Sequence, residues 1–135
     1  MKTGRWGTLA SLLLATAALG CDDDPTFPAD DAAFEVVVSG ETFVVEVTGE
    51  ANVADMEERL ASGAEGVIIG PLLDGDGGFN DPWSWHLDAD EVHVADAAVE
   101  VCDGRPSMVE ADLDYWLDTV GSFCPWGAKV TKRIR

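Results

Sequence analysis

The sequence predicts an α+β domain: a small antiparallel or mixed sheet with two helices packed on it and one disulfide. Three observations lead to this prediction. Two runs rich in Val and Phe flank a short turn, two segments carry apolar residues at helical spacing, and residues 66–73 form a short apolar run bounded by glycine. The domain is expected to span residues 34–135, enough chain for one domain with a modest core.

The first elements follow in order along the chain. Residues 34–49 alternate around the turn at Ser39-Gly40-Glu41 and predict a β-hairpin. Residues 52–63 predict a helix that Asn52 caps and Gly63 ends in the left-handed conformation. The apolar run that follows predicts a buried strand.

The middle of the domain is expected to hold a loop and two strands. Residues 74–82 consist mostly of Gly, Asp, Asn and Pro, which predicts a loop. Residues 83–87 and 92–102 alternate enough to predict strands, and residues 128–134 predict a last strand.

The clearest helix is predicted over residues 107–121. Ser107 and Glu110 have the spacing of a capping box, and Gly121 is the expected stop. Five apolar residues should form the buried stripe of this helix: Val109, Leu113, Trp116, Leu117 and Val120.

The chain has three cysteines, Cys21, Cys102 and Cys124. Cys102 is expected at the end of a strand and Cys124 just beyond the second helix, so a disulfide between them would pin that helix to the sheet. In the chain-entropy model such a bond stabilises the fold by about 3 kcal/mol. The alternative is two free thiols. Trp126 is expected to pack against the disulfide.

Residues 1–20 predict a lipoprotein signal peptide. Two basic residues precede an uncharged, mostly Leu and Ala stretch, residues 6–20, which is shorter than the about 20 residues of a membrane span. The stretch ends in Ala18-Leu19-Gly20-Cys21, which resembles the lipobox of bacterial lipoproteins. The resemblance implies cleavage before Cys21 and a diacylglycerol on its thiol.

Ordinary secretory cleavage after Ala15-Thr16-Ala17 is the alternative. The odd number of cysteines favours lipidation, because it leaves an even pair for an oxidising compartment. A diacylglycerol supplies the two chains that stable anchoring needs. The membrane leaflet that would hold the anchor stays open.

Residues 21–33 predict a tether: the lipidated cysteine followed by an acidic stretch with two prolines. The full chain carries 26 acidic and eight basic residues, a formal charge of −18. Cleavage would remove Lys2 and Arg5, leaving six basic against 26 acidic residues, or −20. Such a charge argues against nucleic acid as a partner, since nucleic-acid binding needs a basic face.

The segment 78–88, GFNDPWSWHLD, holds the candidate ligand-binding residues: Trp83, Trp85, His86 and Asp88. The tryptophans, two residues apart, would share one face of a strand and, with Phe79, offer an aromatic platform for a sugar or peptide. The favoured interpretation is that they fill the core. His86 with Asp88 has the chemistry of a general base or metal ligand, but a structural histidine bonded to the loop is the favoured interpretation.

The loop at residues 74–82, which overlaps this segment, has the residue types of a calcium site. Hard oxygen ligands are offered by Asp74, Asp76, Asn80 and Asp81. The EF-hand spacing fails, since Gly78 and Trp85 occupy the fifth and twelfth positions. No metal site is predicted, and a looser calcium site stays open. No cofactor is predicted either.

The order of these segments resembles a known family, the N-terminal domain of a slime-mould calmodulin-binding protein and its small secreted bacterial relatives, often labelled calmodulin-binding. The resemblance covers roughly residues 34–131. It rests on Asn80, Pro82-Trp83-Ser84, His86-Leu87-Asp88, Glu100-Val101-Cys102-Asp103, Val109-Glu110 and Cys124-Pro125-Trp126. It implies the fold and secretion, and it carries over no catalytic residue.

The function predicted is that of a lipid-anchored binding or interaction module of the bacterial cell envelope, exposed outside the cytoplasm and without catalytic activity. One alternative is an enzyme that uses His86 and Asp88, or a calcium-dependent module. Another, implied by the resemblance, is a domain that binds a calmodulin-like protein, through the basic C-terminal strand that contains Lys129, Lys132 and Arg133.

Overall fold

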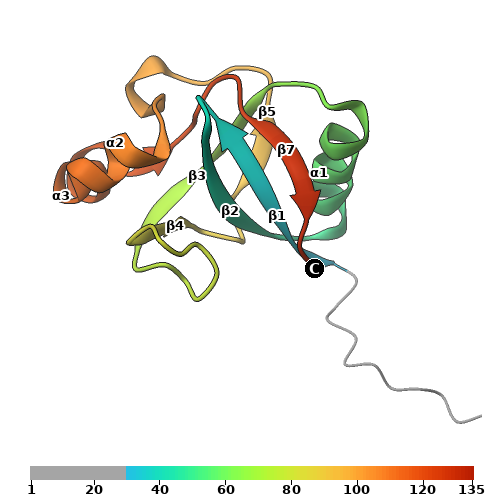
Figure 1. The fold of residues 1–135 in the computed structure, drawn as a ribbon, viewed down its shortest axis with the longest axis horizontal. Coiled ribbons are helices and arrows are strands. Elements are labelled where there is room, and N and C mark those ends of the chain that lie inside the picture. Colours follow the sequence, from blue (N-terminus) through green and yellow to red (C-terminus); the bar gives the residue numbers. More distant parts are fainter. Residues whose placement is uncertain (1–29) are drawn as a thin grey trace, which may run out of the picture.

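The computed structural model of the protein describes residues 30–135. The predicted signal peptide, Cys21 and most of the predicted tether lie outside these residues. The described chain forms two antiparallel sheets, with helix α1 on one side and helices α2 and α3 on the other (Figure 1). The α+β prediction and the disulfide are confirmed, although two sheets take the place of one.

The first sheet has the strand order β2-β1-β7, with β1 at Asp31–Val38, β2 at Glu41–Thr48 and β7 at Lys129–Arg133. Ser39 and Gly40 form the hairpin turn with φ of 50° and 79°, the two positive values that match a turn to the twist of its strands. Strand β1 starts three residues earlier than predicted, so Asp31, Ala32 and Ala33 belong to the sheet and not to the tether.

The second sheet is built around β3, Val67–Asp74, which changes partners along its length. Its first part pairs with β5, His93–Ala95, its last part with β4, Trp85–Leu87, and the two residues between them with β6, Ser122–Phe123. The switch falls at Gly70 and Pro71. Proline has no N–H to donate, so a regular ladder cannot continue through it.

Helix α1, Glu50–Ser62, buries Val53 and Met56 and contacts β7 and β5. Gly63 ends it in the left-handed conformation at φ 64°, as predicted. The predicted cap is wrong. The capping position is Gly49, three residues before Asn52, and the Asn52 amide donates to the Thr48 carbonyl from inside the first turn.

The second predicted helix is broken into three parts. Helix α2 spans Pro106–Ala111, helix α3 spans Leu113–Tyr115, and a π-helical turn, η2, covers Trp116–Val120. The break lies at Asp112, whose φ and ψ of −142° and 55° are not helical. Val109 and Trp116 are buried as predicted, and Gly121 ends the segment with φ 76°.

Two predicted strands are shorter than expected. Trp83 and Ser84 precede β4, and β5 stops at Ala95. Glu100–Cys102 forms a 3-10 turn, η1, so Cys102 lies in a turn and not at the end of a strand. The disulfide nevertheless joins Cys102 to Cys124, with Cα atoms 5.1 Å apart.

The core lies where side chains of both sheets meet. Phe123 contacts the rings of Phe43, Trp85 and Trp116 at centroid distances of 5.5, 5.2 and 6.0 Å. Aromatic pairs at these distances and tilted angles stabilise a fold beyond the area that they bury. None of the described helices is long and apolar enough to cross a membrane.

Candidate functional site

Asn80 holds the loop between β3 and β4 to the neighbouring strands. Its side chain is fully buried, its Oδ1 accepts from the backbone N–H of Val44 at 2.8 Å, and its Nδ2 donates to the carbonyl of Trp85 at 2.7 Å. The side chain therefore satisfies two backbone groups on β2 and β4. Its oxygen is not available to a calcium ion.

The two tryptophans of the segment divide between core and surface. Trp85 is fully buried, and its Nε1 has no hydrogen-bond partner in the described chain. Trp83 stacks on it at 6.3 Å, stays partly exposed, and donates its indole N–H to the Thr42 carbonyl at 2.8 Å. Trp85 therefore fills the core, as the favoured interpretation had it, and the two tryptophans do not form an exposed platform.

His86 holds the acidic loop against β4. Its Nδ1 lies 2.7 Å from the carbonyl oxygen of Gly75, so Nδ1 carries the proton in this contact. The ring of Phe79 meets the imidazole edge-on at 5.5 Å. Gly77, with φ 65°, packs so closely that an added Cβ would lie 2.9 Å from the imidazole. The histidine has the structural role that the sequence favoured.

Asp88 shapes the turn after β4. Its backbone N–H donates to the Pro71 carbonyl at 3.0 Å, and its Oδ1 accepts from the backbone N–H of Asp90 at 3.1 Å. Within residues 30–135 no hydrogen bond joins Asp88 to His86. The residues predicted as one ligand-binding set therefore have separate surroundings.

Two carboxylates of the acidic loop, those of Asp74 and Asp76, accept hydrogen bonds from the backbone. Asp74 accepts from the N–H of Gly75 at 3.0 Å, and Asp76 from the N–H of Gly78 at 2.8 Å. Across the part of the chain that the structure describes, no group of three or more His, Cys, Asp or Glu is placed to hold a metal ion.

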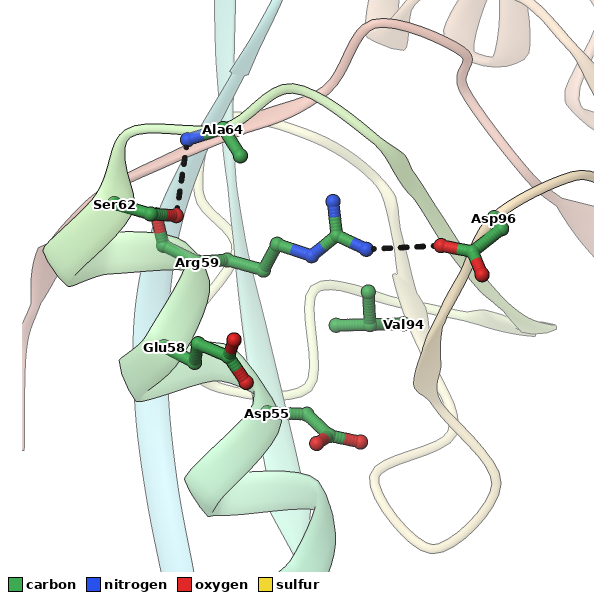
Figure 2. Close-up of a pocket in the computed structure, with 7 residues that line it drawn as sticks. All are labelled: Asp55, Glu58, Arg59, Ser62, Ala64, Val94 and Asp96. Carbon is green, nitrogen blue, oxygen red and sulfur yellow. Dashed lines mark hydrogen bonds and ion pairs between the residues drawn. The ribbon is translucent and has the colours of Figure 1, made fainter.

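A depression of about 490 Å³ lies between α1 and β5, and we call it the α1–β5 groove (Figure 2). Arg59 crosses it, donating from Nη2 to Asp96 at 3.3 Å and from Nη1 to the Glu65 carbonyl at 3.1 Å. Figure 2 shows Asp55 and Glu58 on the same helix beside it. The groove is acidic, and the guanidinium within it already has two partners.

A second depression, of about 280 Å³, lies beside the hairpin turn, and we call it the Arg105 pocket. Trp126 and Met108 provide its apolar surface and are 42% and 46% exposed. Asp103 Oδ1 accepts from the backbone N–H groups of Gly104 and Trp126 at 2.8 and 2.9 Å. These bonds hold two segments of the pocket lining together: the residues that follow Cys102 and the residues that follow Cys124. The lining residues are Ser39, Asp103, Gly104, Arg105, Met108 and Trp126.

Arg105 itself is loosely held. Its Nε lies 3.7 Å from Glu41 Oε1, beyond hydrogen-bond distance. The oxygens of Glu41 are taken by Ser107, whose Oγ and N–H donate at 2.6 and 2.7 Å. These bonds from Ser107, with a smaller contribution from Arg105, hold the pKa of Glu41 below its ordinary value, against the opposing effect of burial.

The chain matches one known protein family. The BP-74 N-terminal domain family matches residues 30–135. The chain belongs to this family. The match confirms the family resemblance drawn from the sequence and begins one residue before β1. No curated protein and no solved structure matches the chain.

In this member of the family the basic strand β7 lies against acidic neighbours. Arg133 pairs with Glu57 on α1 and lies over the ring of Phe34, and Arg135 pairs with Glu46 on β2. These basic residues therefore offset acidic side chains on neighbouring elements. The arginines are thereby less available to an external partner.

Neither pocket of this family member was predicted. The lining of the Arg105 pocket comes from the hairpin turn, the start of α2 and the chain after the disulfide. Trp126, for which packing against the disulfide stays a prediction, is partly exposed and lines the pocket. The signal that was available is the position of Trp126 two residues after a disulfide cysteine, which places it beside residues 103–108.

Proposed function

We propose that the protein is a non-catalytic binding module, anchored to the cell envelope by a lipid on Cys21, and that it binds its ligand at the Arg105 pocket. The observation that carries the proposal is the combination of two exposed apolar side chains, Trp126 and Met108, with an arginine whose only described side-chain contact is a 3.7 Å ion pair with Glu41. Aromatic residues, methionine and arginine are the types enriched at recognition surfaces.

The surroundings of segment 78–88 favour structural roles for its residues over catalytic ones, which supports a non-catalytic function for the protein. Asn80 bonds two backbone groups, Trp85 fills the core, and His86 bonds the Gly75 carbonyl. Each of these side chains has a structural contact that explains its presence. Of the two depressions described, the α1–β5 groove has an arginine with two hydrogen bonds, whereas Arg105 makes only a 3.7 Å ion pair and is free to bind a ligand.

The disulfide and the N-terminal sequence support a location outside the cytoplasm. Cys102 and Cys124 are bonded, and disulfides persist in oxidising compartments. Cys21, the third cysteine, stands in the lipobox-like sequence Ala18-Leu19-Gly20-Cys21.

The alternative functions have less support. For a calcium-dependent role, one candidate ligand is already engaged, because Asn80 Oδ1 accepts from the Val44 N–H. For an enzyme that uses His86 and Asp88, the two side chains are not in contact within the described residues. A calmodulin-like partner would compete with Glu57 for Arg133 of the C-terminal strand and with Glu46 for Arg135, which follows it.

Anchoring is tested by fractionating bacteria that express the full chain or Cys21→Ala. The wild-type protein should sediment with membranes, and the variant should appear in the soluble extracytoplasmic fraction. Full membrane association of Cys21→Ala would overturn the lipid anchor.

Binding is tested by NMR on the ¹⁵N-labelled protein, titrated with small-molecule extracts of the cell envelope. Shifts should gather at the Trp126 indole N–H and at residues 103–108. Shifts centred on His86 and Asp88, or turnover of the bound compound, would contradict the proposal.

A further inference from the structure

The charge of Arg105 is the starting observation. The described chain has four arginines, and three of them are engaged: Arg59 with Asp96 and the Glu65 carbonyl, Arg133 with Glu57, and Arg135 with Glu46. The described partner of Arg105 is Glu41, at 3.7 Å, and Glu41 is already bonded twice by Ser107. The two terminal amino groups of Arg105 thus remain able to donate.

These donors match a small class of anionic acceptors. A guanidinium presents parallel N–H groups in a planar fork, which fits two oxygens of a carboxylate or of a phosphate. The side chain of Arg105 is 53% exposed, so it reaches solvent without a change in the fold.

The apolar half of the pocket is also fixed in place. The backbone of Trp126 is bonded to Asp103, two residues beyond the disulfide. Met108 packs against Gly104, where an added Cβ would meet its methyl group at 3.7 Å and the Trp116 ring at 3.4 Å. A ligand group that enters here meets an aromatic face and a thioether.

Asp103 adds a third requirement. Its Oδ1 accepts from two backbone N–H groups, and its carboxylate lines the pocket. It favours a ligand N–H and repels a second negative group. The formal charge of −18 also disfavours the binding of polyanions.

We infer that the Arg105 pocket recognises an N-acylated amino acid with a free carboxylate and a large apolar side chain. The carboxylate binds Arg105, the apolar side chain packs on Trp126 and Met108, and the amide N–H faces Asp103. The volume of about 280 Å³ is at the small end of the range for ligand pockets, so we expect one such residue to occupy it. The same chemistry occurs in the last residue of a peptide and in a free N-acyl amino acid. The inference rests on the proposed function and names the ligand class for that site.

The test compares matched probes on the full-length protein by tryptophan fluorescence and NMR. N-acetyl-phenylalanine should bind about tenfold more tightly than N-acetyl-phenylalaninamide, which has the same shape without the charge. Arg105→Gln should remove this preference and leave the affinity for the amide unchanged. Trp126→Ala should weaken both probes.

Arg59→Gln is the matched control, because it removes an arginine from the α1–β5 groove and should change neither affinity. Circular dichroism establishes that each variant is folded. Met108→Ala, at an exposed position, provides a second variant of the apolar surface if Trp126→Ala fails to fold, and it too should weaken both probes.

Two further probes separate the sources of the ligand. A tripeptide that ends in Phe should bind at least as tightly as N-acetyl-phenylalanine, and its C-terminal amide should not. A clear gain for the tripeptide assigns a peptide C-terminus, and equal affinity assigns the free N-acyl amino acid.

Equal binding of acid and amide, or an unchanged preference in Arg105→Gln, would overturn the inferred ligand class. The proposed function would survive that result if another compound shifts the Trp126 indole N–H in saturable fashion. If no compound, including the envelope extracts, perturbs this pocket, both the ligand class and the proposed function fail.

Discussion

Glu41 links the hairpin to helix α2 through a single carboxylate. Ser107 donates to it from both Oγ and the backbone N–H, across 66 positions of sequence. Hydrogen bonds to an ionised group are stronger than those between neutral groups. The link therefore stabilises the fold most when Glu41 is charged.

The depressed pKa of Glu41 predicts how stability depends on pH. The folded-state pKa lies below the ordinary value of 4.5, so the unfolded chain binds more protons between the two values. The contribution of Glu41 is fully present above that ordinary value and is lost as pH falls through the folded-state pKa. Glu41→Gln should cost about 1 kcal/mol at pH 7, and the difference from wild type should shrink in acid.

Urea unfolding of wild type and Glu41→Gln between pH 7 and pH 3 measures this dependence. Glu91→Gln is the control, since Glu91 is exposed and its carboxylate has no hydrogen bond within the described chain. A difference between wild type and Glu41→Gln that stays constant down to pH 3 would contradict the link.

Asn80 is the buried polar residue on which the 78–88 loop depends. Asn80→Ala leaves the Val44 N–H and the Trp85 carbonyl without their partner, at about 2–4 kcal/mol in the free energy of unfolding. Asn80→Asp should also destabilise the fold, because a carboxylate accepts from Val44 but cannot donate to Trp85.

Chemical denaturation at pH 7 checks the prediction. Asn52→Ala, which loses one bond to the Thr48 carbonyl in a half-buried place, should cost about 1 kcal/mol or less. Similar losses for Asn80→Ala and Asn52→Ala would show that Asn80 does not hold the loop to the neighbouring strands.

At the scale of elements, local sequence patterns predicted those helices and strands whose form depends on residues close together in the sequence. The hairpin, helix α1 with its glycine end, and strands β3 and β7 were all predicted from periodicity and turn residues. The side chains of β2 alternate between core and surface, and the buried Val53 and Met56 of α1 have the spacing of one helix face. The first residue of α1 and the lengths of β4 and β5 depend on tertiary contacts and were missed.

The broken second helix shows where a local pattern fails. Ser107 and Glu110 have capping-box spacing, yet Ser107 bonds Glu41 and Glu110 accepts from the N–H and Oγ of Ser84. Both partners lie far away in sequence. A pattern read over four residues carries no information on such partners, and the same reason hid the Arg105 pocket.

A double-mutant cycle distinguishes the two uses of Ser107. The pair Ser107→Ala and Glu41→Gln should show a coupling energy of about 1 kcal/mol in the free energy of unfolding, because the two side chains are in contact. The pair Ser107→Ala and Glu110→Gln should be additive within about 0.5 kcal/mol. Coupling in the second pair and additivity in the first would restore the capping box.

At the scale of the whole molecule, one covalent bond joins the parts that form the Arg105 pocket. Residues 103–108 follow Cys102, Trp126 follows Cys124, and the Cys124 N–H donates to the Cys102 carbonyl at 2.8 Å. The disulfide also buries Val67 of β3 in a small cluster of its own. Stability and the geometry of the pocket therefore depend on the same bond.

Removal of the disulfide should consequently affect both properties. Replacing both cysteines by alanine should lower the free energy of unfolding by about 3 kcal/mol, because the crosslink restricts the unfolded chain across 22 residues. The same variant should bind N-acetyl-phenylalanine more weakly, since residues 103–108 and Trp126 are then joined only by hydrogen bonds such as Asp103 to Trp126. Urea unfolding and fluorescence titration measure the two effects on one sample. Unchanged affinity in a variant that remains folded would show that the pocket does not need the crosslink, and unchanged stability would show that the crosslink adds little to the fold.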